Sequence, residues 1–289
     1  MNTDTGEDIM TVSVAQKRAD FFKLHESGCF VLPNPWDAGG ARLLQSLGFK
    51  ALASTSAGFA WSMGRSDYGL KCDELLAHLT ALCAASDLPV NADFESGFAD
   101  DPDGVAANVR KCVATGVAGL SIENRNSDAA KPLYDFALSV ERIRAAREAI
   151  DADKSGALLV ARCEGFLTGE ADLDMTIKRL VAFSEAGADC LYAPGIHSKE
   201  QISAVVKAVA PKPVNVLVLT PDTMVADLAA LGVRRVSLGG HLARAAWGGF
   251  MRAAKEMLEQ GTFTELANGY PGKELQTVFA PYVVRPSAS

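Results

Sequence analysis

The chain has 289 residues, 48% of them hydrophobic, and a formal net charge of −7 at pH 7. This length suits two small domains or one α/β barrel of roughly 250 residues, and we expect a single domain with a large buried core. The acidic balance argues against nucleic acid or an anionic membrane as a partner, since both call for a basic patch. Residues 1–10 carry no signal-peptide pattern and no apolar run is long enough to span a bilayer, so we expect a cytoplasmic protein.

Cysteine and histidine lack the spacing that a metal site or a disulfide framework needs. The six cysteines are scattered singly without a C-x-x-C motif, and the four histidines lie far apart without an H-x-x-x-H motif. We therefore expect free thiols in a reducing compartment and no zinc site built on His and Cys.

After a leading helix from Val14 to Ser27, short apolar runs alternate with segments of helical period. Four helical segments end at a glycine, which suits the left-handed position after a helix, and a strand begins soon afterwards; these joints are 47–52, 115–120, 186–191 and 231–236. The expected strands are 29–32, 50–54, 88–93, 118–122, 157–162, 189–193, 213–217 and 234–238. The expected helices are 37–46, 72–85, 103–114, 139–150, 171–185, 199–209, 222–230 and 241–259.

Eight alternating βα units with apolar strands predict parallel strands covered by helices, and the count favours a closed (β/α)₈ TIM barrel. An open doubly wound sheet is the alternative. It loses its main support because Leu32 is followed by Pro33-Asn34-Pro35-Trp36-Asp37 rather than by G-x-G-x-x-G.

The expected domain covers residues 1–289, with a leading helix in 1–28, the barrel in 29–259 and a C-terminal extension with a further helix in 260–289. The long eighth helix carries Met251, Met257 and Leu258 among its apolar positions. This stripe suits either a subunit interface or core packing within one chain.

The segment Pro89 to Gly97 is a short apolar strand that runs into polar side chains and a glycine. Side chains alternate along a strand, so Asn91, Asp93 and Glu95 share one face. Oxygen-bearing groups at a strand end must be hydrated, paired or bound to a cation. The segment is therefore either a solvated strand end before a turn or the metal-binding end of a barrel strand.

In a barrel, the carboxyl ends of the strands form one bowl that holds the catalytic side chains. Asp93, Glu123 and Arg162 interrupt apolar strands at these ends. They suit a buried ion-pair network, or a Mg²⁺ site where Arg162 pairs with a substrate carboxylate. The small-residue loop 54–58 suits a tight turn or a backbone site for the same anion.

Five segments together resemble the isocitrate lyase/phosphoenolpyruvate mutase superfamily: 64–67, 89–97, 119–124, 161–162 and 186–189. The resemblance runs from about Phe30 to Trp247. It implies a (β/α)₈ barrel whose last helix can be swapped between the subunits of a homodimer or homotetramer. It also implies Mg²⁺, with Mn²⁺ as an alternative, and small anionic 2-oxo or 2-hydroxy carboxylates as substrates.

The resemblance also assigns roles by position. Asp93 and Glu123 would hold the metal through water, Asn91 falls where the family usually has a directly coordinating Asp, and Asp67 would sit in a gating loop. Glu95 is interpreted as a loop carboxylate outside this set. The assigned sites are Arg162, Asp67 and Asn124 for catalysis, Trp36, Thr55, Ser56, Ala57, Arg162 and Asn215 for substrate, and Asp93, Glu123 and Asn91 for metal.

The departures from the family pattern bear on the reaction. The Lys-Lys-Cys-Gly-His motif of the lyase branch is absent. Glu123 is followed by Asn124-Arg125-Asn126-Ser127-Asp128 rather than by the Asp-Lys loop of the mutases, which contains a further Lys and Asn, and this different loop offers Asn124, Arg125 or Asp128 to the site. Our leading hypothesis is a Mg²⁺-dependent enzyme that breaks a C–C bond of a 2-oxo or 2-hydroxy di- or tricarboxylate. The alternatives are a P–C bond enzyme acting on phosphonopyruvate or phosphoenolpyruvate, and a binding protein that has lost catalysis.

Overall fold

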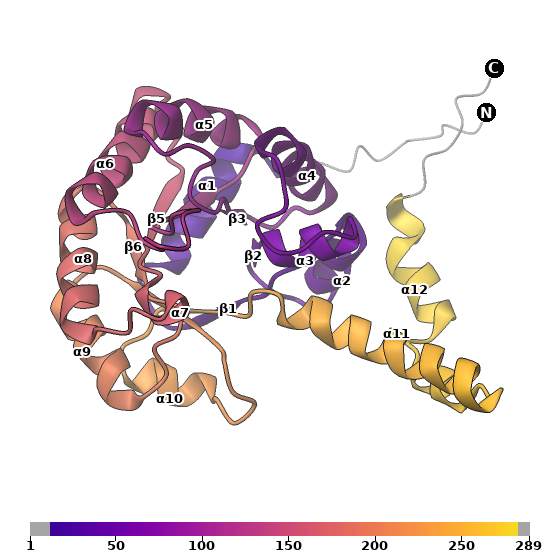
Figure 1. Ribbon diagram of the computed structural model, residues 1–289. Helices are drawn as coiled ribbons and strands as arrows, with labels where there is room; N and C mark the ends of the chain where they lie inside the picture. Colours follow the sequence, from indigo (N-terminus) through magenta and orange to yellow (C-terminus); the bar gives the residue numbers. More distant parts are fainter. Residues whose placement is uncertain (1–11, 283–289) are drawn as a thin grey trace, which may run out of the picture.

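The computed structural model describes residues 12–282, and a ring of eight parallel strands forms its centre (Figure 1). The strands are β1 (Phe30–Leu32), β2 (Leu52–Ala53), β3 (Val90–Asp93), β4 (Gly119–Glu123), β5 (Leu158–Arg162), β6 (Cys190–Tyr192), β7 (Val214–Leu217) and β8 (Arg235–Ser237). They pair in the order β1-β8-β7-β6-β5-β4-β3-β2. Since β1 pairs with β8, the predicted (β/α)₈ barrel is confirmed and the open doubly wound sheet is wrong.

Helices surround the barrel in chain order. They are α1 (Val14–Leu24), α2 (Ala38–Ser46), α3 (Ser56–Ser62), α4 (Cys72–Ala85), α5 (Pro102–Ala114), α6 (Phe136–Ala152), α7 (Gly165–Thr168), α8 (Leu173–Glu185), α9 (Lys199–Val209), α10 (Val225–Ala230), α11 (His241–Gln260) and α12 (Gly272–Phe279), with short 3₁₀ turns η1 (Thr264–Asn268) and η2 (Ala280–Tyr282). The predicted helices match these to within a few residues. Two short helices, α3 and α7, were not expected. Among residues 12–282, no helix combines the length and the apolar character that crossing a membrane requires.

The four glycine joints are confirmed by backbone geometry. Gly48, Gly116, Gly187 and Gly232 have φ between +87° and +105°, the left-handed region that ends a helix at little cost only for glycine. At Gly187 there is a second reason for glycine, because an added Cβ would lie 2.5 Å from Cγ of Arg147. Each joint therefore turns the chain sharply from the outer helix back to the next strand.

The seam between β1 and β2 closes the barrel with few hydrogen bonds. The two strands lie at opposite ends of the pairing order, and Ala53 N donates to Pro33 O at 3.0 Å. The Asn34 side chain spans the remaining gap: its Nδ2 donates to Ser54 O, and its Oδ1 accepts from Leu238 N, both at 2.9 Å. One side-chain amide thus connects the ends of β2 and β8.

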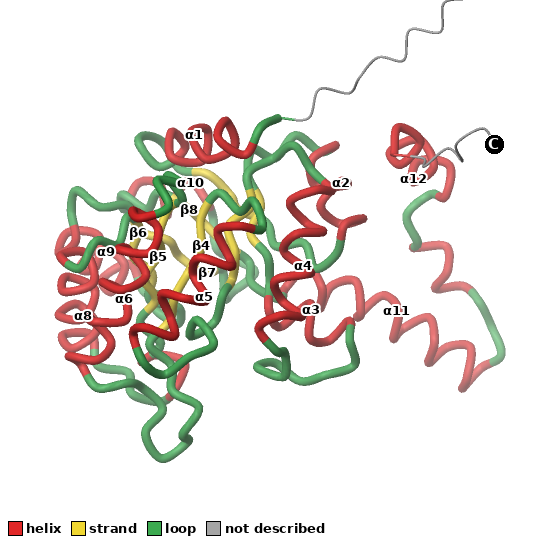
Figure 2. The backbone as a smooth tube through the Cα atoms, turned by 90° about the horizontal axis from the view of Figure 1, so that it is seen from above, coloured by secondary structure: helices red, strands yellow, loops and turns green. Residues whose placement is uncertain are grey.

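Helix α1 covers the amino-terminal end of the barrel, as Figure 2 shows. Its Phe21 is fully buried, and an added Cβ on Gly119 would lie 2.9 Å from the Phe21 ring. The predicted leading helix is confirmed from Val14 to Leu24, while residues 1–11 of that segment lie outside the described residues, as do 283–289 of the C-terminal extension. With this end plugged, the opposite end of the barrel is the one that can admit a ligand.

Helix α11 projects away from the barrel (Figure 1). Trp247, Phe250 and Leu258 are 40%, 61% and 86% exposed. After it, the chain folds back, and the Phe279 ring of α12 lies 3.8 Å from the point where a Cβ on Gly39 of α2 would stand. Core packing within one chain, the second of the two alternatives for the apolar side chains of this helix, therefore does not account for these exposed residues.

Candidate active site

Arg162 stands among three carboxylates at the carboxyl ends of β3, β4 and β5. Its Nη1 lies 2.7 Å from Asp93 Oδ1, its Nη2 3.1 Å from Glu123 Oε2, and its Nε 3.0 Å from Glu164 Oε1. The three groups predicted at successive strand ends are thus brought together, with Glu164 added two residues beyond Arg162.

One guanidinium cannot neutralise three carboxylates. Burial, and then the neighbouring carboxylates, raise the pKa of Glu123 and of Glu164 despite the opposing effect of Arg162. The carboxylates in turn raise the pKa of Arg162 well above its usual value, against the lowering effect of burial. A proton or an added cation must therefore balance the remaining negative charge.

Glu95 adds a further buried carboxylate beside Asp93. It lies in the turn after β3 with φ of +46°, it is 6% exposed, and its Oε1 has no hydrogen-bond partner. Burial, together with the charges of Asp93 and Asp67, raises its pKa to about 8. The sequence predicted Glu95 as a loop carboxylate, and it lies in the turn that follows β3.

Asn91 faces a deeper layer of the barrel than Asp93. Its Oδ1 accepts from Arg235 Nη1 at 3.3 Å, and its Nδ2 donates to Ala92 O at 3.0 Å. Arg235 Nε also donates to Asn215 Oδ1 at 2.8 Å, and Asn215 Nδ2 donates to Ser237 Oγ at 2.9 Å. Two of the predicted site residues therefore belong to an amide and guanidinium network near the floor of the barrel.

The small-residue loop after β2 holds Asp93 in place. Ser56 donates to Asp93 Oδ2 through its N–H at 2.9 Å and its hydroxyl at 2.8 Å, while Ser54 Oγ accepts from Asp93 N at 2.8 Å. Thr55 caps α3, since its Oγ1 accepts from Gly58 N. The two Ser56 donors therefore bind Asp93, and the loop leads directly into α3.

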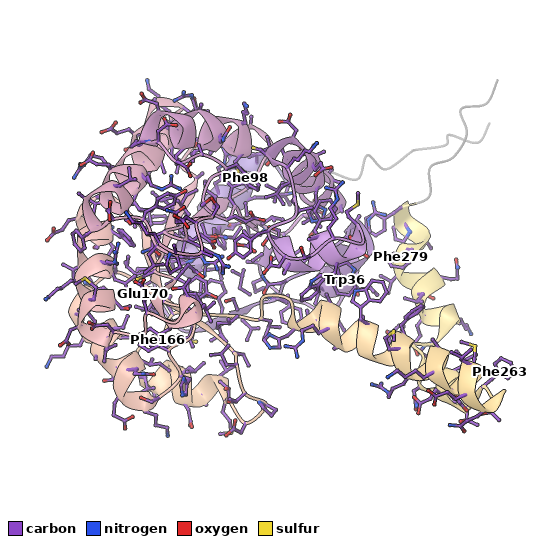
Figure 3. All side chains as sticks on the ribbon, in the orientation of Figure 1. Trp36, Phe98, Phe166, Glu170, Phe263 and Phe279 are labelled. Atoms are coloured by element: carbon purple, nitrogen blue, oxygen red, sulfur yellow. The ribbon has the colours of Figure 1, made fainter. Side chains whose placement is uncertain are left out.

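A cavity of about 200 Å³ is lined by some, but not all, of the predicted site residues. Those that line it are Thr55, Ser56, Ala57, Asp67, Asn91, Asp93, Glu123 and Arg162. Trp36, Asn124 and Asn215 do not line it. Figure 3 labels Trp36 beside the start of α11, away from the barrel centre, and Asn124 Oδ1 accepts from Glu164 N at 2.9 Å behind the cavity wall.

Two further residues line the cavity: Arg125, which is one of the candidates from the loop after Glu123, and Tyr68, which had no predicted role in the site. The Arg125 guanidinium carbon lies 4.2 Å from the centre of the Tyr68 ring. Beside them is Asp67, whose pKa is raised by burial and by Asp93. No local sequence pattern links the two loops, so only the fold brings the pair together.

The donor atoms suit a hard cation that keeps most of its water. Within residues 12–282, no three His, Cys, Asp or Glu residues converge tightly enough to hold a metal by themselves. However, Glu95 Oε1, Glu123 Oε1 and Glu164 Oε2 are buried without a hydrogen-bond partner. The carboxylates around Asp93 carry more negative charge than Arg162 can neutralise. Their oxygens therefore fit Mg²⁺ that is bound by one or two carboxylates and several waters.

Comparison with known proteins agrees with this barrel and site. The family model for phosphoenolpyruvate phosphomutase matches residues 21–258. A lyase/mutase candidate from Burkholderia cenocepacia J2315 has a crystal structure with a TM-score of 0.90 and 49% identity, covering 92% of this chain and 96% of that one. An oxaloacetate acetylhydrolase bound to its product oxalate has a TM-score of 0.81 and 25% identity, covering 91% and 94%.

Among curated proteins, an oxaloacetate decarboxylase of Bradyrhizobium sp. strain BTAi1 is 31% identical over 253 residues, which cover 83% of this chain and 84% of the relative. An uncharacterized protein of Mycobacterium tuberculosis is 32% identical over 271 residues, covering 93% and 99%. The solved structure of a 2,3-dimethylmalate lyase, a member of the PEP mutase/isocitrate lyase superfamily, has a TM-score of 0.81 and 26% identity, covering 92% of this chain and 95% of that one. The chain belongs to the phosphoenolpyruvate phosphomutase family, within the PEP mutase/isocitrate lyase superfamily.

Proposed function

We propose that this protein is a Mg²⁺-dependent, lyase-type enzyme that breaks a C–C bond in a 2-oxo or 2-hydroxy di- or tricarboxylate. The observation that carries the proposal is the cluster of Arg162 with Asp93, Glu123 and Glu164, whose carboxylates exceed the positive charge they share. Such a cluster is costly to bury unless a cation completes it. The cation would act as a Lewis acid toward a substrate oxygen.

In this proposal Asp93 is the protein ligand of the metal. Its Oδ2 is held by two hydrogen bonds from Ser56, whereas its Oδ1 accepts one hydrogen bond from Arg162 and keeps a further lone pair for a cation. Glu123 and Glu95 would bind metal-held water through their unpaired oxygens. Asn91 would not be a ligand, since its amide is engaged with Arg235 in the layer below.

Arg162 would stabilise the charge that develops during bond cleavage. When a 2-oxo acid loses CO₂, the electron pair of the C–C bond remains on the 2-oxo fragment as an enolate. When a 2-hydroxy acid is cleaved, its hydroxyl gives up a proton and becomes the 2-oxo group, and the electron pair stays on the other fragment as the enolate form of a carboxylate. In both cases a negative oxygen develops that needs a fixed positive group. Arg162 is held by three carboxylates on neighbouring strand ends and therefore needs no rearrangement to supply that charge. Asp67, with a raised pKa at the cavity wall, is placed to exchange a proton with the substrate.

The relatives direct the choice of the first substrate. The names of two of them, oxaloacetate decarboxylase and oxaloacetate acetylhydrolase, share oxaloacetate. We therefore test oxaloacetate first, then isocitrate and methylisocitrate, with Mg²⁺ and purified protein, and measure pyruvate, glyoxylate and CO₂. Activity that is abolished by EDTA and by Asp93→Asn supports the proposal, whereas release of none of these products from any substrate overturns it.

The second candidate is P–C bond chemistry, and the match to the phosphomutase family model favours it. Against it stands the loop after Glu123, which begins with Asn124-Arg125 where the mutase pattern has Asp-Lys. Phosphorus NMR of phosphonopyruvate and phosphoenolpyruvate incubated with the enzyme separates the two candidates. Tight binding of 2-oxo acids without turnover would instead support the non-catalytic alternative.

We propose a second copy of the chain as the partner of α11. The exposed side chains of this helix include two aromatic groups in edge-to-face contact, Trp247 and Phe250, with ring centres 5.5 Å apart. The helix projects from the barrel, so its apolar side is not covered by its own chain (Figure 1). A homodimer or homotetramer in which α11 packs on a neighbouring barrel would bury it.

A further inference from the structure

The three arginines that line the cavity differ in the hydrogen-bond and ion-pair partners of their guanidinium groups. Arg162 faces three carboxylates, and Arg235 donates to Asn215 and Asn91 deep in the barrel. The third cation, Arg125, has no carboxylate oxygen within 4.0 Å of its guanidinium in the part of the chain from 12 to 282. It is also half-buried at the rim of the cavity.

Arg125 is held in a defined place despite this missing partner. Its backbone forms an antiparallel bridge with Leu133, and next to it Asn126 N donates to Pro132 O at 2.8 Å. At the base of this hairpin, the Tyr134 hydroxyl donates to Asp100 Oδ1 at 2.5 Å. These hydrogen bonds attach the hairpin to the loop before α5, so the Arg125 side chain extends from a backbone that is held in place.

The Tyr68 ring supports the guanidinium from one face. The guanidinium carbon lies 4.2 Å from the ring centre, so the cation is stacked on the ring and its N–H groups remain free around its edge. Tyr68 adopts φ of +60°, an unusual conformation for a tyrosine, and it projects from the loop that carries Asp67. A planar cation held by its face presents its edge to a carboxylate in bidentate geometry.

We propose that Arg125, supported by Tyr68, is the subsite for a second, distal carboxylate of the substrate, so that the enzyme selects 2-oxo and 2-hydroxy dicarboxylates over monocarboxylates. This inference rests on the proposed function, which places the metal at Asp93 and the developing negative charge of the substrate at Arg162. A dianion entering a cavity lined by Asp67, Asp93 and Glu123 would be repelled at its outer end without a cation there. Arg125 supplies that charge at the rim.

The test compares ligands of equal length with and without the distal carboxylate. With Mg²⁺ present, calorimetry measures the binding of 2-oxoglutarate against 2-oxopentanoate and of malate against 2-hydroxybutanoate, with oxalate as a probe that has no distal group. For the wild type we expect one or both dicarboxylates to bind about 10- to 100-fold more tightly than their monocarboxylate partners. Arg125→Gln should bring that ratio to within about threefold and leave oxalate binding unchanged.

Two variants of Tyr68 test whether its ring is needed to hold the Arg125 guanidinium. Tyr68→Phe keeps the ring and should preserve the preference for dicarboxylates, whereas Tyr68→Ala removes the support and should reduce it by several-fold. Arg144→Gln, at an exposed position of α6, is the matched control and should behave as the wild type. Thermal unfolding of each variant verifies that the fold is intact.

The possible failures are distinguishable. If Arg125→Gln weakens oxalate and 2-oxoglutarate equally, or weakens neither, the distal subsite is overturned while the proposed function stands. If oxalate shows no Mg²⁺-dependent binding to the wild type, the proposed function is overturned and this inference falls with it.

Discussion

Arg235 donates a hydrogen bond to Asn91 across 3.3 Å, one layer below the carboxylate of Asp93. Residues 91 and 93 are adjacent on the same face of β3, yet one contacts the polar network near the barrel floor and the other contacts Arg162 at the open end. A shift of two residues along a strand moves a side chain by roughly 7 Å. This separation decides which position can reach a metal.

We therefore expect Asn91→Asp to leave Mg²⁺ affinity within about threefold of the wild type, because the new carboxylate would pair with Arg235. Asp93→Asn should weaken Mg²⁺ binding by about tenfold or more, since it removes the oriented ligand. Calorimetric titration of Mg²⁺ measures both. A large gain in affinity for Asn91→Asp would show that position 91 does reach the metal.

Arg142 should be a large contributor to stability. It is 1% exposed on α6, and it donates to the carbonyls of Ala99 at 2.5 Å, Asp100 at 2.6 Å and Ser96. Arg142→Met would leave these buried acceptors without donors, so we expect unfolding to become easier by about 2–5 kcal/mol in urea titrations.

The control for Arg142 is Arg144→Met on the same helix, where the side chain is exposed and the expected change is within about 0.5 kcal/mol. Because Arg142 fixes the loop that follows Glu95, its loss should also weaken Mg²⁺ binding. Equal stability of the two variants would contradict this account.

His78 should make the protein sensitive to acid. It is 8% exposed and stacked on Phe59 with ring centres 3.8 Å apart, and burial lowers its pKa to about 4. The unfolded chain takes up a proton on this histidine below about pH 6.5 and the folded chain does not. The contribution of His78 to the free energy of unfolding is therefore fully present above pH 6.5. It decreases by about 1.4 kcal/mol per pH unit between pH 6.5 and pH 4.

His78→Phe removes this titration and retains the stack, so its free energy of unfolding should fall less steeply between pH 6.5 and 4. Urea titrations at several pH values measure the two slopes. Parallel curves for the wild type and the variant would mean that His78 does not titrate in this way.

The apolar side of α11 should determine the size of the assembly. A charge at Phe250, which is 61% exposed, would be buried in the proposed contact, so Phe250→Asp should shift the protein toward the 30.5 kDa monomer. Light scattering after gel filtration measures the mass. The control is Lys255→Ser on the same helix, which should leave the assembly unchanged, and a monomeric wild type would contradict the proposal.

The sequence predicted the barrel because its signals are local. Apolar runs and the glycine joints at Gly48, Gly116, Gly187 and Gly232 are each readable within about ten residues, and each was confirmed. Helix α3 was not predicted because Ser56, Ala57 and Gly58 are small residues that are equally typical of turns. Its formation depends on packing of the completed barrel.

The site was predictable only where the strand ends determine it. Asp93, Glu123 and Arg162 converge because parallel strands end at the same edge. Glu95 lies in the turn after β3 in a left-handed conformation, so alternation along a strand does not give the direction of its side chain. Tyr68 and Arg125 come from loops far apart in the chain, so their contact could be found only in three dimensions.

The barrel should open locally in solution at the seam that the Asn34 amide spans. Seven neighbouring strand pairs are joined by backbone ladders, whereas the ends of β2 and β8 are joined through this one side chain. Local opening begins where the fewest hydrogen bonds must break. The amides of Ala53 and Leu238 should therefore exchange with deuterated water sooner than those of the β4–β5 ladder, and each such opening would widen the mouth of the cavity.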